Sequence, residues 1–343
     1  MKKHQNTLFV TTAGAYLGKD GEAVAVRVDQ EVRMRVPIHT LGGIVCFGQI
    51  GFSPFLLGLC GERGVAVSFL TENGRFLARL QGPTSGNVLL RREQYRRTDE
   101  PAACAALVRP ILAAKIANSR TVLLRALRDR PGHPGTDAVR AAAGRLAHHL
   151  QALTEDLTVD ALRGIEGSAA RVYFEVFDSL IVQQKDSFFL RERSRRPPLD
   201  NMNALLSFIY TLLRHDFAAA LETVGLDPAV GFLHRDRPGR PSLALDLMEE
   251  MRAYLADRLA LSLVNLNQVR SDGFTRGESG GVAMDGETRK TVLVAYQKRK
   301  SEEIVHPFLG EKTTLGLLPH LQAALFARTL RGDLDGYPPF LWK

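Results

Sequence analysis

The residue types with the greatest potential for chemistry lie in one stretch, where a histidine precedes a turn and the turn leads into a helix with acidic side chains. His234 is followed by a segment rich in proline and glycine, and Ser242 is placed to cap the N-terminus of a helix over residues 243–259. Asp246 and Glu249 stand three positions apart and therefore share one face of that helix. Two carboxylates beside a histidine are a typical donor set for a hard divalent metal ion.

A purely structural role for the two acids is the alternative, because carboxylates in the early part of a helix stabilise the helix dipole and are usually solvated. Asp246, however, lies within the apolar sequence LALDLM at residues 243–248. Burying a carboxylate without a partner is costly, so this position requires a cation or hydrogen-bond donors nearby.

Glu166 is a further candidate for the same site. It lies in the sequence GIEG at residues 164–167, where small residues allow a helix or a ligand to approach closely. Ala169, Ala170 and Tyr173 can pack inward, which would leave Glu166 facing a cleft. The alternative is that Glu166 only begins a helix, where an acid is favoured by the dipole. Local spacing does not decide between these two interpretations.

The elements that must position these residues predict an α+β fold, with a small β-rich N-terminal domain over residues 1–84 and a larger all-α domain over residues 85–343. Short alternating or β-branched runs separated by turn residues indicate strands in the first part. The second part is rich in Ala and Leu and contains helix-capping residues. The predicted strands span residues 7–12, 23–28, 31–36, 44–47, 65–70 and 75–80, with a helix from Ser53-Pro54 to before Gly64, a turn at 71–74 and a linker at 82–86.

Three breaks divide the second domain. Loops are predicted at residues 129–136 and 191–198, and Asp200 begins a strongly periodic helix that is most simply core. Residues 271–287 are rich in glycine and are predicted to form a mobile loop.

Composition restricts the classes of partner and compartment. The formal net charge of the 343 residues is +8, which favours polyanionic partners, with nucleic acid as the leading class. Three cysteines without CxxC spacing argue against a disulfide framework or a zinc site and indicate a reducing compartment. No signal peptide is recognisable, and no apolar run approaches about 18 residues, so we expect a soluble cytoplasmic protein without a membrane span.

A set of motifs along nearly the whole chain resembles one family, the CRISPR-associated spacer-acquisition integrases, which are the first of the two universal Cas adaptation proteins. The similarity is greatest to the subtype I-C form. The motifs are NTLFVTT at 6–12, GRFLAR at 74–79, GNVLLRREQ at 86–94, GIEG at 164–167, YF at 173–174, NALLS at 203–207, and the run from GFLH at 231–234 to Glu250.

This resemblance implies a metal-dependent DNA endonuclease and integrase that inserts short duplex fragments into a CRISPR array. Glu166, His234 and Glu249 would be the metal ligands, with Asp246 as a neighbouring catalytic acid, although many family members have Asp in place of Glu249. The metal would be Mg²⁺ or Mn²⁺. The resemblance also implies a homodimer in which the β-rich domain serves dimerisation and DNA contact, and a small second adaptation Cas protein that bridges two dimers.

Attack by a 3′-hydroxyl exchanges one phosphodiester for another, so this chemistry needs a metal site and no nucleotide-binding loop. Two other functions remain open: a non-catalytic DNA-binding scaffold with structural acids, and a structure-selective nuclease for branched DNA with water as the nucleophile. Arg235, Arg237 and Arg240 are expected to contact DNA, because phosphate must approach any metal that acts on it. Two other basic clusters are weaker candidates, Arg91, Arg92, Arg96 and Arg97, and Arg191, Arg193, Arg195 and Arg196.

Overall fold

The chain divides into two structural units. The computed structural model describes residues 6–72, 76–80, 88–154 and 156–342. The first unit comprises residues 1–86, 286–302 and 314–317, and the second comprises residues 87–285, 303–313 and 318–343. The predicted domains, 1–84 and 85–343, did not include this return of the chain to the first unit. Part of the turn predicted at 71–74 and the linker predicted at 82–86 lie outside the described residues.

Two four-stranded sheets form most of the first unit. One has the strand order β1-β5-β7-β8, with β1, β5 and β7 parallel and β8 antiparallel to β7. The other has the order β4-β3-β2-β6, in which only the β2–β6 pair is parallel. The elements are β1 (Asn6–Val10), β2 (Tyr16–Asp20), β3 (Ala23–Val28), β4 (Glu31–Pro37), β5 (Leu41–Phe47), β6 (Gly51–Phe52), α1 (Pro54–Arg63), β7 (Ala66–Leu70), β8 (Phe76–Arg79) and α9 (Gly286–Lys300).

The six strands predicted for this unit correspond to β1, β3, β4, β5, β7 and β8. Helix α1 is also confirmed: the Ser53 hydroxyl accepts a hydrogen bond from the Leu56 amide at 3.2 Å, and Gly64 ends the helix with φ +64°. Strand β2 was missed, because its sequence YLGKD contains glycine and two charged residues. It forms because β3 and β6 pair with its two edges and Leu17 is fully buried.

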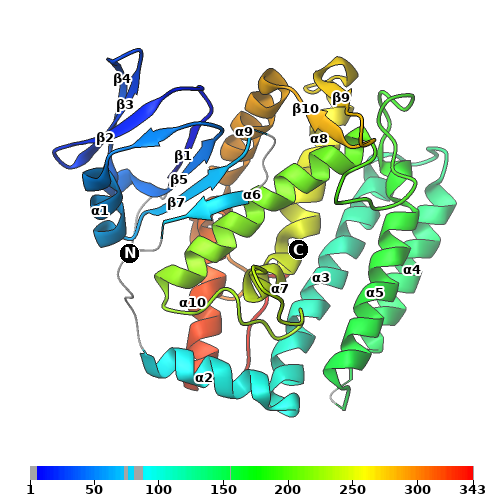
Figure 1. Cartoon of the computed structure of the whole chain (residues 1–343). Coiled ribbons are helices and arrows are strands. Elements are labelled where there is room, and N and C mark those ends of the chain that lie inside the picture. Colours follow the sequence, from blue (N-terminus) through cyan, green and yellow to red (C-terminus); the bar gives the residue numbers. More distant parts are fainter. Residues whose placement is uncertain (1–5, 73–75, 81–87, 155, 343) are drawn as a thin grey trace. The chain divides into compact units, whose positions relative to one another are not determined.

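Helices form most of the second unit. Helix α3 packs against α4, α5 and α7, and α6 packs against α7 and α10 (Figure 1). Because α3 contacts both α5 and α7, it sets the distance between the two helices that carry the candidate acids. The helices are α2 (Val88–Asp99), α3 (Pro101–Asp129), α4 (Thr136–Gln151), α5 (Val159–Glu175), α6 (Asn201–Thr223), α7 (Ser242–Met251), α8 (Arg258–Asn265) and α10 (Leu318–Arg331).

The prediction that the second domain is all α was wrong in detail. Two short two-stranded sheets occur, β9 (Phe274–Arg276) with β10 (Val282–Met284), and β11 (Glu303–Val305) with β12 (Lys312–Thr314). The first sheet lies in the stretch predicted as a mobile loop. That prediction failed because alternate apolar residues bury one face of the hairpin: Val282 and Met284 are buried, and the Phe274 ring contacts Phe188 at 5.2 Å between centroids.

Other boundaries agree with the sequence. Helix α3 ends at Asp129 and α4 begins at Thr136, on either side of the predicted loop. The carboxylate of Asp200 caps α6 by accepting from the Asn203 amide at 2.7 Å. Helices α3 and α6 are long and apolar enough, by length and composition, to cross a membrane, but in each 61% of the apolar window is buried in the protein. Such burial is typical of core helices.

The C-terminal segment packs against helices α3 and α7. Asn118 donates to the carbonyl oxygens of Glu250 and Phe340 at 2.7 and 2.9 Å and accepts from the Trp342 amide at 2.9 Å. The Glu250 carboxylate in turn accepts from the Phe340 amide at 2.7 Å. Through these bonds the chain end is fixed beside α7.

Replacing Phe340 by alanine should lower the free energy of unfolding by about 3–5 kcal/mol, because its side chain is 2% exposed and leaves a cavity against Tyr254. Urea unfolding followed by circular dichroism measures the change. The matched control is the adjacent Leu341→Ala, since Leu341 is 41% exposed and should change stability by less than about 0.5 kcal/mol. Equal effects of the two variants would contradict this role of the C-terminal segment.

Candidate metal and active site

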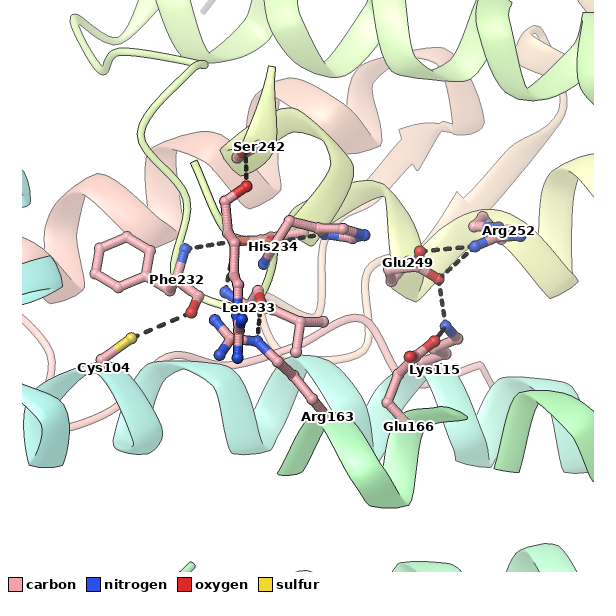
Figure 2. Close-up of polar contacts among 12 residues, drawn as sticks. Cys104, Lys115, Arg163, Glu166, Phe232, Leu233, His234, Ser242, Glu249 and Arg252 are labelled. Atoms are coloured by element: carbon pink, nitrogen blue, oxygen red, sulfur yellow. Dashed lines mark hydrogen bonds and ion pairs between the residues drawn. The ribbon is translucent and has the colours of Figure 1, made fainter. Parts of the chain in front are cut away.

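Two of the predicted acids meet around one ammonium group. Lys115 on α3 forms ion pairs with Glu166 on α5 and, at 2.8 Å, with the Oε2 atom of Glu249 on α7. The Arg252 guanidinium contacts both oxygens of Glu249, at 2.7 and 2.9 Å. Figure 2 shows these four side chains as one connected group. Its two positive and two negative charges balance, which allows the group to be largely buried.

The electrostatic environment favours the charged form of Glu249. Burial alone raises the pKa of this carboxyl, whose side chain is 5% exposed, but the positive charges of Arg252 and Lys115 outweigh burial and lower the pKa well below 4.5. An ionised, buried carboxylate is a strong donor for a cation. Glu166 is more accessible, with 27% of its side chain exposed.

Asp246 fixes His234 and the backbone before it. One carboxylate oxygen accepts from the amides of Phe232 and Leu233, at 2.6 and 3.0 Å, and the other accepts from the His234 amide at 2.9 Å and from its Nδ1 atom at 2.6 Å. The Asp246 side chain has no exposed surface, whereas that of His234 is 22% exposed. Because the carboxylate only accepts hydrogen bonds, Nδ1 carries the proton and Nε2 keeps its lone pair.

Neighbouring helices hold the same backbone segment. Arg163 on α5 donates to the Leu233 carbonyl at 2.6 Å, and Cys104 on α3 donates to the Phe232 carbonyl at 3.2 Å (Figure 2). Arg163 lies one turn before Glu166. Helix α5 therefore supports both the acidic group, which is Glu166 and Glu249 with their two cations, and the histidine segment, residues 231–240. The buried Cys104 thiol is free, as expected for a core cysteine, and burial raises its pKa to about 11.

The prediction that Ser242 caps α7 was wrong. Ser242 is the first helical residue, its hydroxyl donates to the Arg235 carbonyl at 3.3 Å, and the helix amides of Leu243 and Ala244 point to the Pro228 carbonyl. A glycine is required at position 231, because a Cβ there would lie 2.6 Å from the Cβ of Ser242 and 2.8 Å from its backbone carbon. The chain before His234 therefore folds directly onto the start of α7.

The helix after Ser242 is also not uniform. Helix α7 ends at Met251 and a π-helical stretch, Arg252–Asp257, precedes α8. The predicted single helix over 243–259 did not include this change. The π-helical stretch begins at Arg252, after Met251, so the altered winding affects the residue that pairs with Glu249. Turns of this kind frequently occur at functional sites.

The structure therefore arranges the four predicted site residues as two pairs of contacts. Glu166 and Glu249 share Lys115, and His234 binds Asp246. Within the described part of the chain, no group of three or more His, Cys, Asp or Glu side chains is arranged to hold a metal ion. Asp246 and Glu249 lie on one helix, as predicted, but each has its own partners.

A cavity of about 350 Å³ opens beside the acidic group. The expected cleft near Glu166 is thus present. Among the described residues, a Cβ added at Gly164 or Gly167 would meet no atom outside its own helix within 4 Å, so no close helix contact depends on these glycines. Its lining includes Lys115, Glu166, Gly167, Arg193, Tyr210, Glu249 and Arg252. Arg252 and Arg193 lie over the Tyr210 ring at 4.3 and 5.4 Å, and Tyr210 donates to Asp257. This side of the cavity is therefore cationic and aromatic.

Arginines from two clusters that are far apart in sequence lie close enough in space to repel one another. The pKa of Arg240 is lowered, first by partial burial and then by repulsion from Arg237, Arg195 and Arg196, with Asp246 opposing. Mutual repulsion of this kind indicates a concentrated positive potential close to the His234 segment. Arg235 pairs with Asp160 at 3.2 Å, with both side chains 70% exposed. Of the third predicted cluster, Arg96 and Arg97 pair with Glu93 on helix α2.

Sequence reasoning did not identify Lys115 or Arg252 as members of the site. A signal was present for Lys115, which is the only charged residue in the stretch PILAAKIANS at 110–119. A lone lysine in an apolar helix needs a buried anionic partner. Which acids provide that partner depends on helix packing.

Comparison with known proteins agrees with this fold. Among solved structures, a casposase bound to integration product has a TM-score of 0.81 at 21% identity, and the match covers 99% of this chain and 95% of that chain. A Cas6–RT–Cas1–Cas2 complex also gives a TM-score of 0.81, at 22% identity, covering 99% of this chain and 36% of that chain. At these identities the structures establish the fold, a β-rich unit followed by a mostly helical one.

Sequence comparison then gives the family. The model for CRISPR associated protein Cas1 matches residues 8–298. A curated relative from Chlorobaculum tepidum, named CRISPR-associated endonuclease Cas1 1, is 55% identical over 343 residues, which cover 100% of both chains. The chain belongs to the Cas1 family, and the family predicted from the sequence motifs is confirmed.

Proposed function

We propose that this protein is a metal-dependent DNA endonuclease and integrase that joins the 3′-hydroxyl ends of short duplex DNA to the strands of a CRISPR array. The observation that carries the proposal is the convergence of Glu166 and Glu249 on one cation, next to a histidine that Asp246 holds in place. Support comes also from the name of the Chlorobaculum tepidum relative, an endonuclease, and from the fold shared with a casposase bound to integration product.

The residues fit a divalent cation by their chemistry. The ammonium of Lys115 lies between two carboxylates. Two carboxylates at such a position are also suitable ligands for a divalent cation. His234 would add an imidazole nitrogen, since its hydrogen bond to Asp246 leaves Nε2 as the donor atom. Glu166, Glu249 and His234 are the proposed ligands, and two oxygens with one nitrogen suit Mg²⁺ or Mn²⁺.

The side chains have separate proposed roles in strand joining. When bound, the metal ion supplies acidification of the attacking hydroxyl and polarisation of the scissile phosphate. Asp246 orients the His234 ring and is a positioning residue. Arg237 and Arg240, with Arg195 and Arg196, bind phosphates near the site, because their mutual repulsion is relieved by a polyanion. Arg235 is also proposed to bind a phosphate, which requires that its ion pair with Asp160 breaks.

The proposed partners follow from this chemistry and from the family. Double-stranded DNA is the substrate as both inserted fragment and array. The protein is proposed to act as a homodimer, with the β-rich unit contributing to dimerisation and DNA contact, and to bind the small second adaptation protein, since the fold is shared with a Cas6–RT–Cas1–Cas2 complex. We place it in the cytoplasm, where its DNA substrates are.

With Mn²⁺ present, the protein and its second adaptation protein should join a 3′-hydroxyl oligonucleotide to a supercoiled plasmid carrying an array, and EDTA should abolish the product. The reason is that Glu166 and Glu249 alone supply no Lewis acid to polarise the scissile phosphate. Gel electrophoresis of a labelled oligonucleotide measures joining.

A 3′-deoxy oligonucleotide is the control for the nucleophile. Loss of product with this substrate supports strand transfer, whereas strand breaks independent of the 3′-hydroxyl would identify water as the nucleophile and favour a branched-DNA nuclease. Tight DNA binding without joining or cleavage in any metal would instead favour the non-catalytic scaffold.

A further inference from the structure

Lys115 occupies an unusual place for a lysine. It lies on α3 among apolar residues, its side chain is only 11% exposed, and its ammonium contacts Glu166 and Glu249 at the same time. These acids belong to two different helices, α5 and α7, which are separated in the sequence by α6 and are joined by their packing against α3. One ammonium therefore holds together two carboxylates that would otherwise repel each other.

The charge of the group limits what else can bind. Lys115 and Arg252 balance Glu166 and Glu249, so a divalent cation added to this group would leave an excess of two positive charges. Arg252 contacts both oxygens of Glu249 and lies over the Tyr210 ring, so it is held by two kinds of contact. Lys115 is the cation whose charge lies directly between the two carboxylates.

Space for a rearrangement exists next to the group. Lys115, Glu166 and Glu249 all line the cavity of about 350 Å³. A cation that enters through the cavity reaches both carboxylates, and the flexible lysine side chain can withdraw into the same space. Glu166, which is 27% exposed, faces this route.

We propose that Lys115 is a positioning residue that takes the place of the divalent cation: it holds Glu166 and Glu249 together before the metal binds and is displaced when it does. This inference rests on the proposed metal ligands. It accounts for the contact of both carboxylates with a single ammonium group. Lys115 thus stabilises the metal-free protein and competes with the metal.

The test measures Mn²⁺ binding directly, by calorimetry and by the electron paramagnetic resonance signal of free Mn²⁺, on full-length protein stripped with EDTA. Lys115→Met should bind Mn²⁺ about tenfold more tightly than the wild type, because a competing charge is removed from a partly buried site. It should also melt at a lower temperature in EDTA, and Mn²⁺ should raise its melting temperature more than that of the wild type.

Three further variants make the result specific. Lys115→Arg keeps a cation and should retain wild-type stability in EDTA without tighter Mn²⁺ binding. Lys185→Met is the matched control, since Lys185 pairs with Asp178 at 2.6 Å on an exposed surface, and its Mn²⁺ affinity should be unchanged. His234→Ala tests the ligand set separately and should weaken Mn²⁺ binding.

The outcomes separate the two proposals. Mn²⁺ binding that weakens with His234→Ala but is unchanged or weaker with Lys115→Met would overturn the role of Lys115 alone. An absence of Mn²⁺ binding in the wild type and in Lys115→Met would overturn both. If Lys115→Met does not fold, Lys115→Gln, which keeps a hydrogen-bond donor without the charge, serves for the same comparison.

Discussion

His234→Ala should reduce Mn²⁺-dependent strand joining at least about 100-fold while the protein stays folded. Loss of an outer partner of a metal ligand typically costs 10- to 100-fold, and His234 is proposed as a ligand itself. The fold should survive because the side chain is 22% exposed and the backbone amide that binds Asp246 is retained. Joining assays and thermal unfolding measure the two effects.

The control for this variant is His148→Ala, because His148 is an exposed histidine on helix α4. It should join DNA at the wild-type rate. If His234→Ala also joins at that rate while Glu166→Gln does not, the metal is held without the imidazole, and the site consists of carboxylates only. If all three join normally, the proposed active site is wrong.

The sequence predicted which residues share a helix and which need a partner, but it did not predict the partners themselves. Spacing placed Asp246 and Glu249 on one helix, and the apolar surroundings of Asp246 indicated that it needs a partner; both expectations agree with the structure. The sequence could not show that this partner is mainly backbone, because the amides of Phe232 and Leu233 reach Asp246 only when Gly231 brings the chain close to Ser242.

The role of Lys115 could not be predicted for a related reason. Its partners Glu166 and Glu249 lie on helices that become neighbours only through the packing of α3, and the periodicity of one segment does not say which faces meet. The strands were predicted well because short runs of β-branched and apolar residues bounded by turn residues are a local pattern of the sequence. Strand β2 escaped because pairing on both edges compensates for its poor local propensity.

The structure also changes what is expected of the acids. If Glu166 and Glu249 were metal ligands and nothing more, alanine at either position would abolish activity without changing stability. Glu249 is now seen to neutralise Arg252, whose side chain is 13% exposed, so it has a structural role in addition to the proposed ligand role. Glutamine is therefore the more informative substitution at that position.

Asp246→Ala should lower both the stability of the protein and its affinity for Mn²⁺. The free energy of unfolding should fall by about 4 kcal/mol, because three backbone amides with bonds of 2.6–3.0 Å lose their acceptor in a buried place. His234 would also lose the bond that orients its ring, so Mn²⁺ affinity should fall about 10- to 100-fold. Denaturant unfolding and calorimetry measure these changes.

Asp236→Ala is the matched control, since Asp236 is an exposed aspartate in the same segment and should alter neither quantity. Asp246→Asn separates two functions of the carboxylate: asparagine keeps one acceptor oxygen but turns an amide group toward donors, so stability should recover only in part. If Asp246→Ala lost joining yet kept wild-type stability and Mn²⁺ affinity, Asp246 would act on the DNA directly. It would then be a catalytic acid, and the backbone contacts would be incidental to its function.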